Sequence, residues 1–250
     1  MRYTVWLNSL SLADVNPAIY ITDIAYQAQA LRYTTNKLLG RDGSYAGKES
    51  LDSNMVSVSF MLRIYDTAQR QQALQDIVRW AIGGGWLATS DRPGQRLRVK
   101  ATRLPGITSV MRWTDTLTLE FTAYDQPYWQ DVTPQTATAQ SQGSASLYNP
   151  GVRPAMVEAT ITAGDTLTSV TVTCGDTTID LTGISLSSGD TVVISYTEDH
   201  HLLQIKKGTT SLLDKRTAAS SDDLIAQPGY NTVTCSAGAS CQFRVKGVWV

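Results

Sequence analysis

Short runs in which apolar and polar side chains alternate recur along this chain, and they restrict its fold more than any other feature of the sequence. One run, residues 54–65, places Val56, Val58 and Phe60 on one face and mostly polar side chains on the other. This pattern is typical of a β-strand with one buried face, because successive side chains of a strand point to opposite sides. We therefore predict a mainly β protein.

One segment departs from this alternation. After Asp66, the apolar residues Leu74, Ile77 and Ala81 recur at helical spacing. Asp66 can cap the first turn, and the glycines at 83–85 are expected to end the helix, because glycine accepts the left-handed backbone conformation without a Cβ penalty. The N-terminal half is therefore predicted to be α+β, with one helix packed on an antiparallel sheet.

The C-terminal part has a different pattern. From residue 153 onward, about seven short alternating runs follow one another at roughly ten-residue spacing, with turn residues between them, which predicts a β-sandwich. Residues 132–152 carry no charge and are rich in Thr, Ser, Gln and Ala, a composition that favours a linker or extended arm. We predict an N-terminal domain over 1–131, a linker over 132–152 and a C-terminal domain over 153–250.

The sequence offers little that could support chemistry. The two histidines, His200 and His201, are adjacent and would point to opposite faces of a strand, and the three cysteines do not match a zinc-binding pattern. We predict no catalytic, cofactor-binding or metal-binding residues. A pair of carboxylates stays open as the one enzymatic alternative, a glycosidase or peptidase, and Glu198–Asp199 and Asp222–Asp223 are the available clusters.

The charge and hydropathy of the chain limit its partners. The formal net charge of −1 gives no strong overall attraction to nucleic acid or to an anionic membrane. No apolar run reaches the roughly 18–20 residues that a membrane-spanning helix needs. We therefore expect the chain to fold in the cytosol without contact with a membrane.

A basic strand is the first candidate interaction site. Arg96, Arg98 and Lys100 alternate with apolar residues and would share one face of a strand. Such a face could meet phosphate or an acidic protein surface, or it could be a solvated or subunit-facing strand, and we favour the second interpretation.

The stretch AYDQPYWQD, which begins at residue 123, is the second candidate. Its aromatic residues could stack on a sugar, or they could bury against the helix and close the first domain. We favour closure, in which Phe121 finishes the sheet, Pro127 breaks it, and Tyr128 and Trp129 seal the domain. We call these four residues the latch.

Several motifs occur in a particular order. GRDGSYAGKE at 40–49 precedes the strand at 54–65, the capped helix, WLATSDRPG, the basic strand and the ending LTLEFTAYDQPYW, and after 132–152 come PGVRPAMVEATIT and PGYNTVT. Together they resemble the distal tail protein (Dit) family of phages with long, non-contractile tails. The resemblance covers nearly the whole chain and implies a galectin-like C-terminal domain.

The resemblance implies a virion structural protein without enzymatic activity or cofactor, located at the tail tip and in the host cytoplasm during assembly. Such proteins form a ring, typically a homo-hexamer, between the major tail (tube) protein and the tail-associated hub or fibre protein. Receptor-binding proteins attach peripherally, and DNA passes through the channel as cargo. Arg96, Arg98 and Lys100 would then face a subunit interface or the lumen.

The galectin-like label raises the alternative of a carbohydrate-binding module that recognises host cell-wall glycan. The sugar-site residues of true galectins, a His-x-Asn-Pro-Arg motif and a stacking Trp followed by Glu and Arg, are missing from this sequence. We therefore expect the sandwich to act as a structural spoke of the ring.

Overall fold

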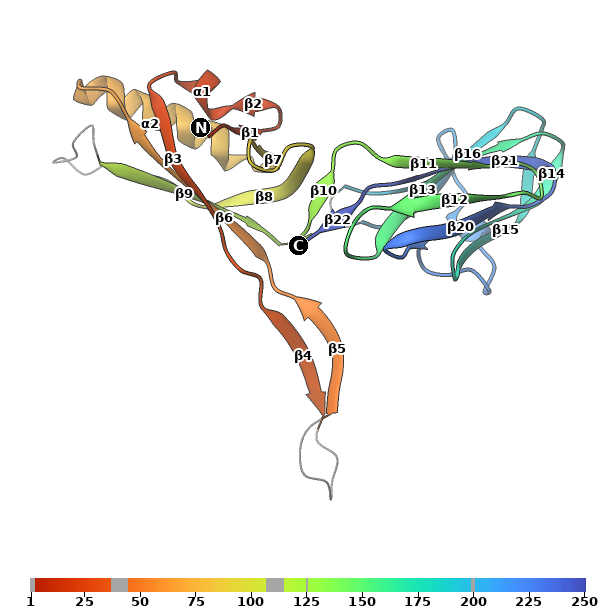
Figure 1. Cartoon of the computed structure of the whole chain (residues 1–250). Coiled ribbons are helices and arrows are strands. Elements are labelled where there is room, and N and C mark those ends of the chain that lie inside the picture. The colour runs from red at the N-terminus through yellow and green to blue at the C-terminus, as the bar shows by residue number, and fades with distance from the viewer. Residues whose placement is uncertain (1–2, 37–44, 107–114, 125, 199–200) are drawn as a thin grey trace. The chain divides into compact units, whose positions relative to one another are not determined.

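The computed structural model describes residues 3–36, 45–106, 115–124, 126–198 and 201–250. The chain divides into two compact units, Met1–Trp129 with Val250, and Gln130–Trp249 (Figure 1). Both units are built mainly from antiparallel strands, which confirms the predicted fold class.

The first unit contains one long antiparallel sheet. Its strand order is β2 (Leu10–Ser11), β1 (Val5–Leu7), β7 (Gly85–Thr89), β8 (Gln95–Arg103), β9 (Thr116–Ala123), β6 (Asn54–Leu62) and β3 (Ile19–Tyr26). The alternation read from the sequence holds in β6, where every second residue from Asn54 to Leu62 is buried. A short helix, α1 (Leu12–Val15), follows β2.

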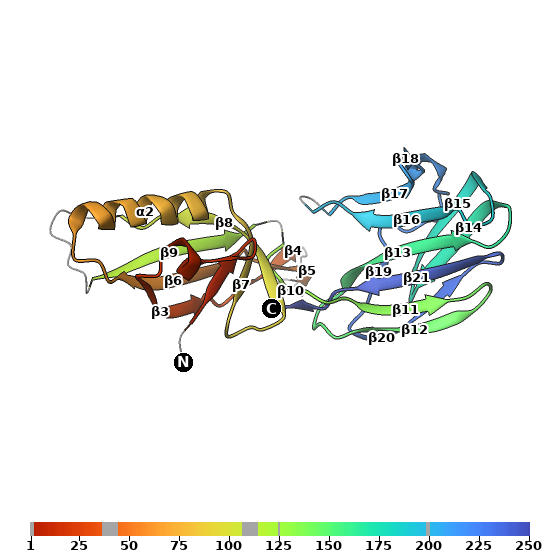
Figure 2. The same ribbon diagram turned by 90° about the horizontal axis from the view of Figure 1, so that it is seen from above.

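The predicted helix is α2 (Thr67–Ile82), which lies across one face of this sheet (Figure 2). The Asp66 carboxylate accepts a hydrogen bond from the Gln69 backbone N–H at 2.8 Å, so the predicted cap is present. Gly84 follows the helix with a φ of +61°. On the buried side, Trp80 meets the ring of Phe121 edge-on, with centroids 6.1 Å apart. The predicted helix and its end signals are confirmed.

The cap gives a first testable expectation. Replacing Asp66 with alanine should lower the free energy of unfolding by about 1 kcal/mol, because the Gln69 N–H loses its acceptor. Asp66→Asn keeps an oxygen acceptor and should cost only a few tenths of a kcal/mol. Urea unfolding of both variants measures the difference, and equal losses for Ala and Asn would contradict the capping role.

A separate hairpin continues from β3 and β6. It consists of β4 (Leu31–Asn36) and β5 (Tyr45–Leu51), with Leu31 opposite Leu51 (Figure 1). Among the described strands, these two pair only with each other. A lone two-stranded hairpin is at best marginally stable in water, so this hairpin needs further contacts for its stability.

The second unit is a sandwich of two antiparallel sheets. The larger has the order β11 (Gln135–Ala139), β21 (Ala239–Val245), β13 (Ala155–Ala163), β16 (Thr191–Tyr196), β17 (Leu203–Lys207) and β18 (Thr210–Ser211), and β19 (Ile225–Ala226) also pairs with β13. The smaller has the order β12 (Ser144–Asn149), β20 (Gly229–Cys235), β14 (Leu167–Cys174) and β15 (Thr177–Leu186). Alternate residues of both sheets are buried, which confirms the predicted β-sandwich.

The structure corrects the prediction of a linker over 132–152. This stretch forms β11 and β12, which are edge strands of the two sheets and pair with the C-terminal strands β21 and β20. Ala139 and Leu147 are fully buried. The uncharged composition was misleading, because these strands obtain their pairing and burial from residues about a hundred positions away. The second unit accordingly begins at Gln130.

Two short strands connect the beginning and the end of the second unit. β10 (Trp129–Asp131) pairs with β22 (Val248–Trp249), and the Trp249 indole N–H donates to the Asp131 carboxylate at 2.9 Å. Cys174, Cys235 and Cys241 are free and buried. Burial raises the pKa of Cys174 to about 11, so this thiol stays protonated near neutral pH.

Candidate interaction surfaces

The basic row of β8 is present as predicted. Arg96, Arg98 and Lys100 alternate with the buried Leu97 and Val99 and therefore share the face of β8 opposite the core. The three cations are not equivalent, because Lys100 is exposed whereas the two arginines are half-buried.

Two aromatic residues, Trp86 and Tyr124, lie beside this row. The Arg96 guanidinium lies over the ring of Trp86, 3.9 Å from its centroid, a cation–π contact that holds the arginine against β7. Arg98 and Lys100 line a small cavity of about 100 Å³ together with Tyr124. The row thus combines positive charge with aromatic surface, and Lys100 is its most accessible cation.

Two of the four latch residues, Phe121 and Trp129, are buried in the first unit. Phe121 is fully buried in the sheet core, and Trp129 is only 1% exposed. Trp129 meets the ring of Tyr26 edge-on at 5.7 Å, and the Arg92 guanidinium lies 5.0 Å from the centroid of its ring. The ring contacts of Trp129 are thus with β3 and with Arg92. Trp80 is the helix residue that reaches the latch, through Phe121.

The backbone at Pro127 is also held in place. Its carbonyl accepts hydrogen bonds from the side-chain amides of Gln29, at 2.6 Å, and Asn54, at 3.3 Å. Tyr128 is half-buried and Tyr124 is 58% exposed, so the aromatic residues of this stretch do not form one common platform. The contacts resemble those of a closing segment more than those of a sugar-stacking surface.

Sequence reasoning missed the residues that receive Trp129. Tyr26 lies on the edge strand β3, and its hydroxyl donates to the Asp91 carboxylate at 2.7 Å. Burial raises the pKa of Tyr26, so the phenol stays protonated and remains a donor. No local sequence pattern indicates that these residues meet, because Tyr26, Arg92 and Trp129 are far apart along the chain.

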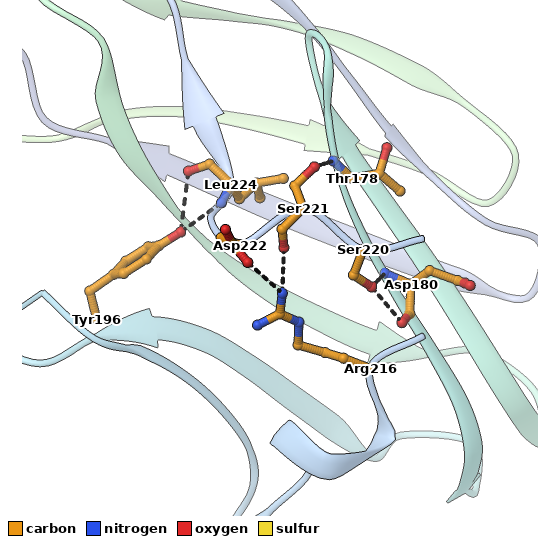
Figure 3. A network of polar contacts seen from close by, with 8 residues as sticks. All are labelled: Thr178, Asp180, Tyr196, Arg216, Ser220, Ser221, Asp222 and Leu224. Atoms are coloured by element: carbon orange, nitrogen blue, oxygen red, sulfur yellow. Dashed lines mark hydrogen bonds and ion pairs between the residues drawn. The ribbon is translucent and has the colours of Figure 1, made fainter. Parts of the chain in front are cut away.

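A polar network in the second unit fixes the segment that precedes β19 (Figure 3). The Arg216 guanidinium donates to the Ser221 carbonyl at 2.6 Å, and the Ser221 hydroxyl accepts from the Thr178 backbone N–H at 3.0 Å. The Tyr196 hydroxyl bridges the backbone N–H and carbonyl of Leu224 at 2.8 and 3.2 Å. These contacts hold residues 216–224 across β15 and β16.

Of the carboxylates that the sequence offers in clusters, Glu198 and Asp222 are exposed and Asp223 is half-buried. Asp222 is fully exposed and lies 3.8 Å from Arg216, and burial together with the Asp222 charge raises the pKa of Asp223. Asp199 and His200 lie outside the described residues, as do residues 40–44 of the GRDGSYAGKE motif. In the described parts of the chain, no three His, Cys, Asp or Glu side chains gather where they could hold a metal ion. No described helix is long and apolar enough to cross a membrane.

These features define a class of fold: a unit with one long helix, α2, on an antiparallel sheet and a two-stranded hairpin, followed by a β-sandwich. The chain is similar to the Dit protein of phage SPP1, described as a paradigm of the hub adsorption apparatus in phages that infect Gram-positive bacteria, with a TM-score of 0.78 and 12% identity over 98% of this chain and 99% of that one.

The chain is also similar to chains of the phage P2 baseplate in its activated conformation. The structure with calcium gives a TM-score of 0.55 and 10% identity, and the structure with strontium gives 0.54 and 11%, each over 98% of this chain and 97% of the other. No protein-family model and no curated protein sequence matches the chain. At these identities the likeness establishes the fold.

Proposed function

We propose that this protein is a structural component of a phage tail tip, which assembles into a ring and joins the tail tube to the host-adhesion hub. The observation that carries the proposal is the likeness to the SPP1 hub protein across both units and nearly the whole length of each chain. Fold likeness that extends over two units in the same order supports a shared architectural role more strongly than likeness of one common domain would.

The hairpin β4–β5 supplies a physical reason for self-association. Leu31 and Tyr33 of β4 are 48% and 50% exposed. Among the described strands, β4 pairs only with β5, so no other strand of the unit covers them. Docking on a neighbouring copy would bury this apolar surface and stabilise a hairpin that is marginal alone. In closed rings the same surfaces repeat in every copy, so one such contact suffices to build the assembly.

In this assembly the N-terminal units form the annulus and the sandwiches project outward. The tail tube docks on one face and the hub or fibre protein on the other, receptor-binding proteins attach peripherally, and DNA passes through the centre. The basic row Arg96, Arg98 and Lys100 faces the lumen or the neighbouring subunit. The latch keeps the N-terminal unit closed at its junction with the sandwich.

Mass photometry and negative-stain imaging of the purified chain test the proposal. We expect particles at a multiple of 27.2 kDa with a central hole, held by interfaces of at least ~1,200 Å². The double variant Leu31→Glu/Tyr33→Glu should shift the distribution toward monomer, because it places charge on surface that would be buried. Tyr65→Glu is the matched control, because Tyr65 is 78% exposed in the same unit and belongs neither to the hairpin nor to the basic row. A strict monomer on the order of 10 µM would overturn the proposal.

A further inference from the structure

The outward face of the small sheet in the second unit carries two tyrosines in contact. Tyr148 on β12 lies directly opposite Tyr230 on β20, and their ring centroids are 4.9 Å apart with planes tilted by 43°. Tyr148 is 44% exposed and Tyr230 is 79% exposed. They are the only large hydrophobic side chains exposed on the four strands of this sheet, all of which the structure describes.

Hydroxyl groups continue the same face away from the tyrosines. Along the β12–β20 ladder the next outward pairs are Ser146 with Thr232 and Ser144 with Thr234. Outward pairs on neighbouring strands recur about every 7 Å, because each strand residue advances about 3.4 Å. The Thr234 hydroxyl lies 2.6 Å from that of Thr173 on β14, so the hydroxyl surface extends to the next strand. We call these three pairs, Tyr148–Tyr230 included, the tyrosine–hydroxyl strip.

The strip carries no formal charge. The sequences of β12 and β20, SASLYN and GYNTVTC, contain no acidic or basic residue. Farther across the sheet, the Asp180 carboxylate accepts hydrogen bonds from the hydroxyls of Thr171, at 2.6 Å, and Thr217, at 3.0 Å. A surface of this kind has no electrostatic preference for nucleic acid, an anionic lipid or a charged peptide.

The backbone beneath the tyrosines is firmly held. Asn149, next to Tyr148, is 1% exposed and donates to the carbonyls of Arg153 and Ala226, both at 3.0 Å. Asn231, next to Tyr230, accepts from the Gln227 backbone N–H at 2.9 Å and donates to its carbonyl at 2.7 Å. The two rings are therefore presented on a prepared scaffold, which lowers the ordering cost of binding.

We infer that the tyrosine–hydroxyl strip binds a neutral polysaccharide, with sugar rings stacked on Tyr148 and Tyr230 and sugar hydroxyls bonded to the Ser and Thr rungs. A sugar ring presents apolar C–H groups on its face and hydroxyls around its rim. The strip places aromatic rings, which suit the apolar face, next to hydroxyl groups, which suit the rim, and it carries no formal charge. The exposed apolar area, two rings, is small for a stable protein–protein interface, which needs about 600 Å² or more from each partner. This chemistry favours a glycan over a second copy of the chain.

The inference adds a ligand to the proposed function. One strip with two stacking rings is expected to bind weakly, and a ring of several copies would raise the avidity for a repetitive polymer. Only this gain in avidity depends on the ring of the proposed function. Binding by a single chain does not require a ring.

Affinity electrophoresis in native gels provides the test, with dextran, laminarin, hydroxyethyl cellulose or galactomannan cast in the gel and polygalacturonate as the charged comparison. We expect at least one neutral polymer to retard the full-length protein. The variant Tyr148→Ala/Tyr230→Ala should weaken the association by about tenfold or more, because two stacking contacts are lost. Tyr230→Ala alone should give a smaller loss, and Tyr230→Phe should retain most of the binding.

Tyr65→Ala is the matched control, because Tyr65 is 78% exposed in the first unit and its removal also deletes one exposed ring. It should bind like the parent protein. Equal retardation of the parent and the double variant, loss of binding in Tyr65→Ala, retardation by polygalacturonate alone, or no retardation by any neutral polymer would each overturn the inference. Mass photometry of the same samples scores ring formation separately, so failure of the glycan site and failure of the ring proposal are distinguishable.

Discussion

Replacing Trp129 with alanine is expected to lower the free energy of unfolding of the first unit by about 3–5 kcal/mol, the range for truncating a buried aromatic side chain. Trp129 is 1% exposed and fills space against the Tyr26 ring, with the Arg92 guanidinium over its own ring. Its loss removes the transfer free energy of the indole, leaves a cavity, and ends the edge-to-face and cation–π contacts.

The measurement must separate the two units, because a chain of two units need not unfold in a single two-state transition. Calorimetry that resolves the two transitions, with hydrogen exchange of peptides from residues 3–36 as a local measure, satisfies this need. Tyr124→Ala is the matched control: Tyr124 belongs to the same segment but is 58% exposed, so its truncation should cost at most about 0.5 kcal/mol. Similar losses for the two variants would show that Trp129 does not close the unit.

Replacing Arg70 with alanine should have the second largest effect, a loss of about 2–3 kcal/mol in the free energy of unfolding of the first unit. The Arg70 side chain is buried in α2, and its guanidinium donates to the Ile64 carbonyl at 2.8 and 3.1 Å and to the Tyr65 carbonyl at 3.1 Å. These carbonyls belong to the connection between β6 and α2. Truncation removes charge-assisted hydrogen bonds and leaves partly buried acceptors without them.

The same helix offers a control for Arg70. Arg79 is 75% exposed at its side chain and pairs with Asp76 at 3.1 Å, so Arg79→Ala should change the stability by less than about 0.5 kcal/mol. Arg70→Lys keeps the charge but loses the fork that reaches both carbonyls, and an intermediate loss is expected. A loss below about 0.5 kcal/mol for Arg70→Ala, measured by denaturant unfolding, would show that water replaces the guanidinium at these carbonyls.

Local sequence patterns predicted the elements of this fold well. The alternation at residues 54–65, the cap at Asp66 and the glycines after Ile82 act over a few residues, and each corresponds to a feature of the structure. Residues 132–152 were misread, because their composition is that of a linker whereas their strands β11 and β12 are completed by β21 and β20. A local pattern cannot report a partner that arrives near the other end of the chain.

The candidate surfaces show the same difference between what local patterns predict and what distant residues decide. The sequence placed Arg96, Arg98 and Lys100 on one face of a strand and predicted that Phe121 and Trp129 close the domain. It could not show that Trp86 holds Arg96 or that Tyr26 and Arg92 receive Trp129.

By itself, the sequence determined where the regularly alternating strands and the helix α2 form and which side of each is apolar, because these properties depend on the period of neighbouring side chains. Only the tertiary structure decided which strands pair, and hence that Tyr148 lies against Tyr230 and that β12 belongs to the sandwich. Strand pairing joins residues that are distant in sequence through backbone hydrogen bonds. These bonds are nearly the same for every residue type and therefore leave little trace in the sequence.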